Sequence, residues 1–234
     1  MIKNYLSKGY LKARLFNNDE FDIIQEFFLN HIARLLRKYK VNKKSSKKKI
    51  IETYHKLNIN EKEHSKIFQA KNRHFKMPKS LKDIILNPRL KKILSQILFA
   101  ELKKKKIKLW DEKYGDIAFR IVRPFSKDGY PFTKKEWGPA GNAVSIWVPI
   151  IGMNKNNTIK FVSGSNQKTY EKFLPKNTKF IKNEYRLRKR IKKKKISSLK
   201  YQKGDGLIFS SKLLHSEDNN FSKITRVNIE FRIK

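Results

Sequence analysis

The C-terminal stretch 225–232 restricts most strongly what this chain can fold into. Apolar and polar residues alternate along it, which is the pattern of a β-strand with one buried face. Val227 and the apolar residues at every second position after it are predicted to face a core, whereas Arg226 and Asn228 face the other side. A glycine turn at 204–206 and a short apolar run precede this stretch. The chain is therefore predicted to end in antiparallel β-structure.

A histidine, His215, precedes Arg226 by eleven positions. If the two residues lie on neighbouring strands, their side chains are close in space. An imidazole can bind a metal ion, and a planar guanidinium meets a carboxylate with two parallel hydrogen bonds, so one interpretation is that the two residues form a binding site. The alternative is that His215 packs in the core and Arg226 is one more surface cation of a basic chain. The spacing alone leaves both interpretations open.

The first half of the chain has helical periodicity. Apolar residues three or four positions apart over 19–39 predict an amphipathic helix opened by Asn17, Asn18 or Asp19. A polar linker at 42–49 and a second helix over 50–57 are predicted to follow.

Pro88 is predicted to start a helix over 89–104, after a short turn capped by Ser80. Lys103–Lys106 are predicted to be cations at the C-terminal end of this helix. From 107 onwards, strands and turns dominate.

This order of elements predicts an α+β fold with a mainly β core, a double-stranded β-helix (jelly roll) buttressed by N-terminal helices. We expect one domain over 1–234. Its first part, 1–106, is mostly helical, and 107–234 forms the β-helix core with a basic loop at 186–195.

Four segments, in this order, resemble the phytanoyl-CoA dioxygenase-like branch of the Fe(II)/2-oxoglutarate-dependent oxygenases, and the resemblance spans most of the chain. They are Gly9-Tyr-Leu-Lys-Ala-Arg-Leu-Phe16, Ile117-Ala-Phe-Arg-Ile-Val-Arg-Pro124, Asn142-Ala-Val-Ser-Ile-Trp-Val-Pro-Ile-Ile-Gly152 and Lys160-Phe-Val-Ser-Gly-Ser-Asn166. The resemblance implies that His215 is the distal iron ligand. It also implies that Arg226 holds the far carboxylate of the cosubstrate 2-oxoglutarate.

The resemblance implies that the other two iron ligands form a His-x-Asp pair, commonly followed two residues later by Trp. The chain departs from the family at this pair. With the family's Trp placed on Trp137, Thr133 stands where the histidine belongs and Lys135 where the aspartate belongs. A lysine ammonium has donors and no acceptor, so it cannot ligate iron while charged. No His-x-Asp occurs anywhere in the sequence. Fe(II) binding is therefore doubtful, and His74 or Glu136 is a minor alternative ligand.

Lys135 suggests a different use of the same pocket. Together with Arg226 it would make a site with two fixed cations, which favours an anionic ligand without a metal. 2-Oxoglutarate remains a candidate for that ligand. The alternative is that the alignment on Trp137 is shifted and Lys135 is a solvated loop lysine.

The charge of the chain indicates polyanionic partners. There are 57 Lys and Arg against 20 Asp and Glu, a net charge of +37. The longest basic run, 186–195, is interpreted either as a solvated loop or as a binding site for an anionic small molecule or carrier-linked substrate. Its candidate anion-binding residues are Arg186, Arg188, Lys189 and Arg190. Non-specific polyanion binding is a third alternative, and binding that vanishes at moderate salt would indicate it.

The composition excludes several classes of site. The chain has no cysteine, so disulfides, thiolate nucleophiles and zinc-thiolate sites are excluded. No apolar run reaches the length of a membrane span and no signal peptide is recognised, which predicts a cytoplasmic location.

Two functional hypotheses follow. The first is a 2-oxoglutarate-dependent hydroxylase with an unusual iron site. The second is a non-catalytic pseudoenzyme that binds an anionic ligand or polyanionic partner.

Overall fold

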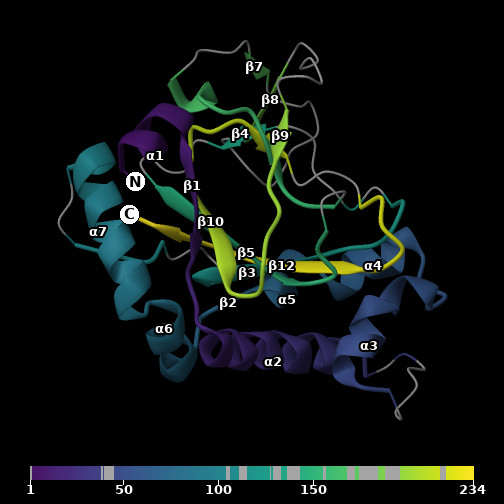
Figure 1. Cartoon of the computed structure of the whole chain (residues 1–234). Coiled ribbons are helices and arrows are strands. Elements are labelled where there is room, and N and C mark those ends of the chain that lie inside the picture. Colours follow the sequence, from purple (N-terminus) through teal and green to yellow (C-terminus); the bar gives the residue numbers. More distant parts are fainter. Residues whose placement is uncertain are drawn as a thin grey trace.

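The computed structural model describes most of the chain (Figure 1). The described residues are 2–37, 39, 45–103, 106–110, 115–126, 128, 143–154, 157–167, 196–216 and 220–234 (backbone only at 102), with the backbone alone at 133–135, 172–173 and 184–187.

The helices are α1 (Ile2–Lys8), α2 (Asn18–Leu35), α3 (Lys47–Glu52), η1 (Tyr54–Lys56), α4 (Glu61–Ile67), α5 (Ala70–Arg73), α6 (Lys79–Ile85), α7 (Pro88–Leu102) and η2 (Ser165–Gln167). The strands are β1 (Tyr10–Arg14), β2 (His74–Phe75), β3 (Ile117–Val122), β4 (Thr133–Lys135), β5 (Val144–Ile151), β6 (Lys160–Phe161), β7 (Lys172–Phe173), β8 (Glu184–Leu187), β9 (Ser197–Ser198), β10 (Asp205–Ser210), β11 (His215–Ser216) and β12 (Arg226–Ile233).

The described strands form two antiparallel sheets, the arrangement of a double-stranded β-helix. The large sheet has the order β1-β10-β5-β12-β3-β2, and the small sheet has the order β7-β8-β4-β11-β6-β9. Trp147 and Phe209 of the large sheet pack with Phe161 of the small sheet in one apolar cluster. This cluster therefore lies between the sheets, and the predicted jelly-roll fold with N-terminal helices is confirmed.

The main core lies on the other face of the large sheet, where the helices cover it (Figure 1). Val227, Ile229 and Phe231 of β12 pack there with Phe28 and Ile32 of α2. Each of these five side chains is at most 1% exposed. The alternation of apolar and polar faces along β12 is confirmed, but the prediction of a single buried face is wrong. All eight residues of β12 are buried, because one face meets α2 and the other faces the small sheet.

Local sequence signals explain where the two long helices begin. Asn17 caps α2 in a capping box with Glu20, whose carboxylate accepts the Asn17 backbone N–H at 2.8 Å. Asn87 caps α7 and Pro88 occupies its first turn. Lys103 ends α7 in a left-handed conformation, with φ 57°.

Two predicted boundaries are wrong. The short helix before Pro88 begins after Pro78, so Ser80 lies inside α6 and does not cap it. Lys47–Lys49 belong to the first turn of α3, which Ser46 caps, and not to a linker. In both cases the helix begins upstream of the predicted start, after Pro78 in α6 and after Ser46 in α3.

The N-terminal part also contributes to the β core. β1 pairs with β10 at one edge of the large sheet, and β2 pairs with β3 at the other edge. Tyr5 of α1 donates a hydrogen bond to Glu101 of α7 at 2.6 Å, and Ser210 of β10 donates to the same carboxylate at 2.6 Å. Helices and sheet are therefore interlocked, although the single-domain division itself stays a prediction.

Candidate functional site

His215 lies at the start of β11 and points into the space between the sheets. Its side chain is buried, and its ring packs edge-on against Phe209, with centroids 4.8 Å apart. The Nδ1 atom is 2.8 Å from the carbonyl oxygen of Leu213. A carbonyl can only accept, so Nδ1 carries a proton. In the neutral ring, Nε2 is then the nitrogen that can act as a ligand or an acceptor.

Thr133 occupies the position directly opposite His215. β4 pairs with β11 in the register Thr133 to His215, and on its other side β4 pairs with β8 in the register Thr133 to Arg186. Lys135 stands opposite Glu184 in the same pairing. Directly paired positions are the closest neighbours across an antiparallel ladder. The structure therefore brings three of the candidate positions, 133, 186 and 215, into one row of the small sheet.

The basic run is only partly described. Arg186 belongs to strand β8 and not to a loop, which corrects the start of the predicted basic loop. Trp137, Arg188, Lys189 and Arg190 lie outside the described residues.

Arg226 begins β12 and is completely buried. In the register of β12 with β5, Glu230 is opposite Trp147, which faces the space between the sheets. Arg226 lies four positions earlier on the same strand and therefore shares that face. The prediction that His215 and Arg226 are on neighbouring strands is wrong. β11 belongs to the small sheet and β12 to the large one, so the two residues enter the interior from opposite sheets.

The Arg226 guanidinium is held by Asn157, a residue that no sequence motif indicated. Arg226 Nη1 donates to the backbone carbonyl of Asn157. The Asn157 side-chain amide donates to the carbonyl of Gly152 and to Ser222 Oγ, the latter at 3.0 Å. Asn157 is 1% exposed, so these hydrogen bonds are shielded from water. They tie the guanidinium to the end of β5 and to the loop before β12.

Gly152 allows the chain to pass close to β12 at this point. Its φ is +70°, and an added Cβ would lie 2.2 Å from the carbonyl oxygen of Thr225. Only glycine combines this backbone conformation with so close an approach. The signal that could have found this site is the turn formed by Gly152 and the asparagines after it.

The wall of the interior beside His215 is aromatic and aliphatic. Tyr201 lies 5.2 Å from the Trp147 ring and Tyr10 lies 4.3 Å from the Phe161 ring, measured between centroids. Burial raises the pKa of Tyr201 above its ordinary value, so this hydroxyl stays protonated. The interior therefore combines apolar walls with a histidine and an arginine.

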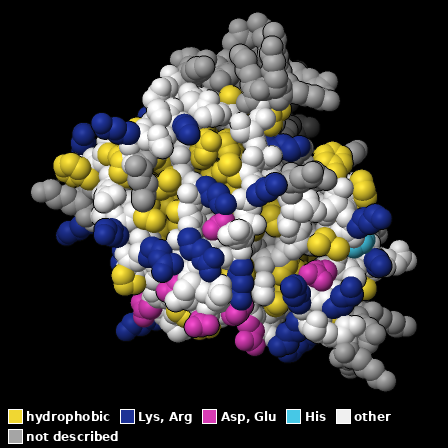
Figure 2. All heavy atoms as spheres, viewed as in Figure 1, with side chains coloured by type: hydrophobic (Ala, Val, Ile, Leu, Met, Phe, Trp, Pro, Cys, Tyr) yellow, Lys and Arg dark blue, Asp and Glu magenta, His cyan; other side chains and the backbone are white. Residues whose placement is uncertain are grey.

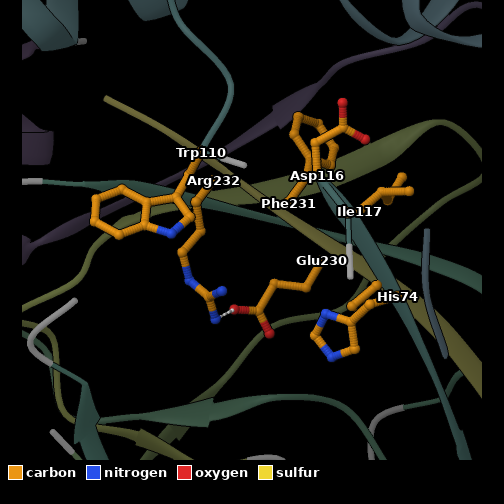
Figure 3. A pocket seen from close by; sticks show the side chains of 9 residues that line it. His74, Trp110, Asp116, Ile117, Glu230, Phe231 and Arg232 are labelled. Carbon is orange, nitrogen blue, oxygen red and sulfur yellow. Dashed lines mark hydrogen bonds and ion pairs between the residues drawn. The ribbon is translucent and has the colours of Figure 1, made fainter. Parts of the chain in front are cut away.

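A second polar cluster lies farther along β12 (Figure 3). The Glu230 carboxylate lies between the Arg232 guanidinium, with which it forms an ion pair, and the ring of His74 on β2. Burial, with Arg73 as the next cause, lowers the pKa of His74 to about 4. The adjoining cavity has a volume of about 10 Å³, which is room for at most a single water molecule. This cluster is therefore too small to hold an organic acid.

The described residues do not supply a three-ligand iron centre. No group of three or more His, Asp or Glu residues in the described ranges could hold a metal ion. His74 lies beside the Glu230 carboxylate at the edge of the large sheet. Glu136 lies outside the described residues. His215 alone has the chemistry of the expected ligand set, so within these ranges the donors do not fit Fe(II) coordination.

The two facing sheets, with a buried histidine and a buried arginine between them, define a double-stranded β-helix (jelly roll) with a polar interior. The chain belongs to the phytanoyl-CoA dioxygenase (PhyH) family, whose family model matches residues 5–228. The search of curated proteins found no match.

Solved structures of oxygenases share this fold. The non-heme monooxygenase ThoJ in its apo form has a TM-score of 0.60 and 10% identity, over 99% of this chain and 76% of that one. EctD from S. alaskensis, solved with 2-oxoglutarate and 5-hydroxyectoine, has a TM-score of 0.57 and 12% identity, over 99% and 74%. SnoK, an alpha-ketoglutarate-dependent carbocyclase from nogalamycin biosynthesis, has a TM-score of 0.57 and 12% identity, over 99% and 81%. At these identities the likeness establishes the fold alone.

None of the helices in the described part of the chain has the length and hydrophobicity of a membrane-spanning segment.

Proposed function

We propose that this chain binds an anionic ligand between its two sheets, with Arg226 as the carboxylate-binding residue, and does not assemble the three-ligand iron centre of its family. The observation that carries the proposal is the register of β4 on β11, which sets Thr133 opposite His215. A threonine hydroxyl is a poor substitute for an imidazole as an Fe(II) ligand. In this proposal the interior is a binding pocket, and the protein is a pseudoenzyme.

The burial of Arg226 supports the carboxylate-binding role. A guanidinium in a water-poor site attracts an anion more strongly than one at the surface, because the low local dielectric weakens its charge less. The Asn157 carbonyl orients it, so little freedom is lost when a carboxylate arrives. We propose Lys135, Arg186, Arg188, Lys189 and Arg190 as further anion-binding residues, which would bind an acidic small molecule or a carrier-linked substrate.

A second candidate function is a 2-oxoglutarate-dependent hydroxylase. Family membership supports it, as do the neighbours whose titles name 2-oxoglutarate or alpha-ketoglutarate. In this case His215 and two ligands from the undescribed part of the chain would hold Fe(II), and Arg226 would hold the cosubstrate. The metal would supply oxygen activation, and the apolar wall would keep water out.

Anaerobic Fe(II) titration, with and without 2-oxoglutarate, separates the two candidates. We expect the wild type to give no visible charge-transfer band, while 2-oxoglutarate still raises the melting temperature. The double variant Thr133→His, Lys135→Asp is expected to gain Fe(II) affinity by at least about tenfold, because it restores two ligands beside His215. A band in the wild type would establish an iron site and favour the hydroxylase. A folded double variant without any gain would contradict the placement of Thr133 at the metal position.

Replacing Arg226 tests the anion site directly. Arg226→Ala is expected to weaken 2-oxoglutarate binding by about 100-fold or more, because it removes a bidentate, charge-assisted contact in a buried site. Arg226→Lys keeps the charge and removes the planar fork, so it should recover only part of the affinity. Isothermal titration calorimetry measures both, and Arg89→Ala on the exposed first turn of α7 serves as the control. Unchanged affinity in a folded Arg226→Ala variant would show that the ligand binds elsewhere.

A further inference from the structure

Two exposed phenylalanines lie on adjacent loops beside the start of β12. Phe125, in the turn after β3, is 72% exposed, and Phe221, in the loop before β12, is 52% exposed. The loops touch through a parallel bridge between Pro124 and Asn220, and the Phe125 N–H donates to the Asn220 carbonyl at 2.8 Å. Phe125 and Phe221 therefore occupy neighbouring positions, and Ile224, 37% exposed, follows in the same loop.

Buried hydrogen bonds hold both loops in place. The Asn220 side chain is completely buried and donates to the carbonyls of Val122 at 2.9 Å and Ile224 at 2.7 Å. Ser126 Oγ donates to the Arg123 carbonyl at 3.0 Å and closes the turn that carries Phe125. The two aromatic rings are thus presented to solvent by ordered loops, which lowers the entropy cost of binding.

The backbone of Phe125 is in a strained conformation. Its φ is +54°, in the left-handed region that a bulky residue rarely adopts. Glycine or asparagine would adopt this conformation more easily. The Phe125 side chain points into water and contributes nothing to the core. Strained residues that the surroundings hold in place are characteristic of binding surfaces.

One lysine contacts the Phe221 ring, and two more lie on the same loop or on the segment packed against it. Lys160 Nζ lies 5.8 Å from the centroid of the Phe221 ring, and Lys223 is exposed within the same loop. Lys56 is exposed next to His55, whose ring contacts the Thr225 hydroxyl at 3.1 Å. Figure 2 shows hydrophobic and basic side chains beside one another on the right of this face, where Figure 1 places the loop that leads into β12.

We propose that these loops dock on the surface of an anionic lipid bilayer. The contact residues are Phe125, Phe221 and Ile224, with Lys56, Lys160 and Lys223 around them. Aromatic and aliphatic side chains at exposed tips enter the interfacial region, while lysines meet the lipid phosphates and carboxylates. Ile224 favours a lipid over a nucleic-acid strand, because an aliphatic side chain offers no face for base stacking. The net charge of +37 adds a long-range attraction to such a surface. The proposal does not depend on the ligand between the sheets.

Sedimentation with lipid vesicles tests the proposal. The full chain is expected to bind vesicles of phosphatidylcholine mixed with phosphatidylserine, and to bind phosphatidylcholine alone more weakly. The double variant Phe125→Gly, Phe221→Ser should lose at least about tenfold in affinity for the mixed vesicles, since it removes two apolar side chains from the contact. Because glycine relieves the strain at 125, Phe125→Gly alone should raise the melting temperature. A double variant that melts no lower than the wild type then shows that the loss of binding does not come from loss of folding.

Phe99→Ser is the matched control. Phe99, on α7, is 57% exposed and has Lys103 Nζ at 5.8 Å from its ring, much as Phe221 has Lys160. Unchanged vesicle binding by Phe99→Ser supports the proposal. The proposal would be overturned if Phe99→Ser lost as much vesicle affinity as the double variant. Full vesicle binding by the double variant, or no vesicle binding by the wild type, would also overturn it. If the double variant loses affinity for a single-stranded oligonucleotide and keeps vesicle binding, the occupant is a nucleic acid and the lipid proposal is wrong.

Discussion

Replacing Asp128 with alanine is expected to lower the free energy of unfolding by about 3–5 kcal/mol, because it leaves a buried arginine without its counter-ion. Arg123 Nε and Nη2 donate to the two Asp128 carboxylate oxygens at 2.9 and 3.0 Å. The exposed fractions of these side chains are only 11% and 8%. Burial would raise the pKa of Asp128, but the hydrogen bonds from Arg123 outweigh it and hold the pKa below its ordinary value. Urea denaturation of the two proteins measures the difference.

Asp22→Ala is the control for this prediction. Asp22 forms an ion pair with Lys203 at 2.7 Å, but the two side chains are 56% and 44% exposed. Exposed pairs of this kind contribute less than about 1 kcal/mol, since water screens them. A similar small loss for both variants would mean that the Arg123–Asp128 pair is no more than a surface contact. A large loss at Asp128 alone would show that the turn leading towards β4 is fixed to the helical layer.

Acid should destabilise the protein steeply, because buried histidines must take up protons. Burial lowers the pKa of His64 and His74 to about 4 from the ordinary value of 6.5, and it also lowers the pKa of His31 and of His55. The unfolded chain binds these protons more readily than the folded one. The stability from each neutral histidine is therefore complete above about pH 6.5 and falls as the pH approaches 4. For His64 and His74 the loss is of order 3 kcal/mol each.

His64 is the residue with which to test this dependence. The Tyr54 hydroxyl and His64 Nδ1 form a hydrogen bond of 3.0 Å, and His64 Nε2 faces an Asp128 carboxylate oxygen at 3.7 Å. His64→Gln removes the titrating group. Melting temperatures measured between about pH 7 and about pH 4 should fall less for this variant than for the wild type. If the melting temperatures of the wild type and the variant fell in parallel with pH, His64 would already be protonated in the folded protein. Its burial would then not be what limits stability in acid.

The sequence singled out the two buried residues of the candidate site but not what surrounds them. His215 and Arg226 could be named from residue type, spacing and family resemblance, because their chemistry is carried by their own side chains. Asn157 and Gly152 could not. Asn157 acts through a hydrogen bond to a residue 69 positions later, and the need for glycine at 152 comes from the approach of Thr225. Contacts of this range depend on how strands from distant parts of the chain come together.

Local features were largely determined by the sequence itself. Asn17 with Glu20, and Asn87 with Pro88, define the starts of α2 and α7, because capping involves residues within one turn of each other. The alternation along β12 predicted which face is apolar, since the side chains of a strand alternate between its two faces. It did not predict that the polar face is buried as well.

Only the tertiary structure decided which strands are neighbours. It placed β1 at the edge of the large sheet, Thr133 opposite His215, and His215 and Arg226 in different sheets. It also brought Phe125 beside Phe221, two residues that nothing in their local sequence connects. The physical reason is that a strand satisfies its backbone hydrogen bonds with whichever edge the whole fold presents. Pairing is therefore set by the packing of the entire chain, whereas a helix satisfies most of its hydrogen bonds within its own segment.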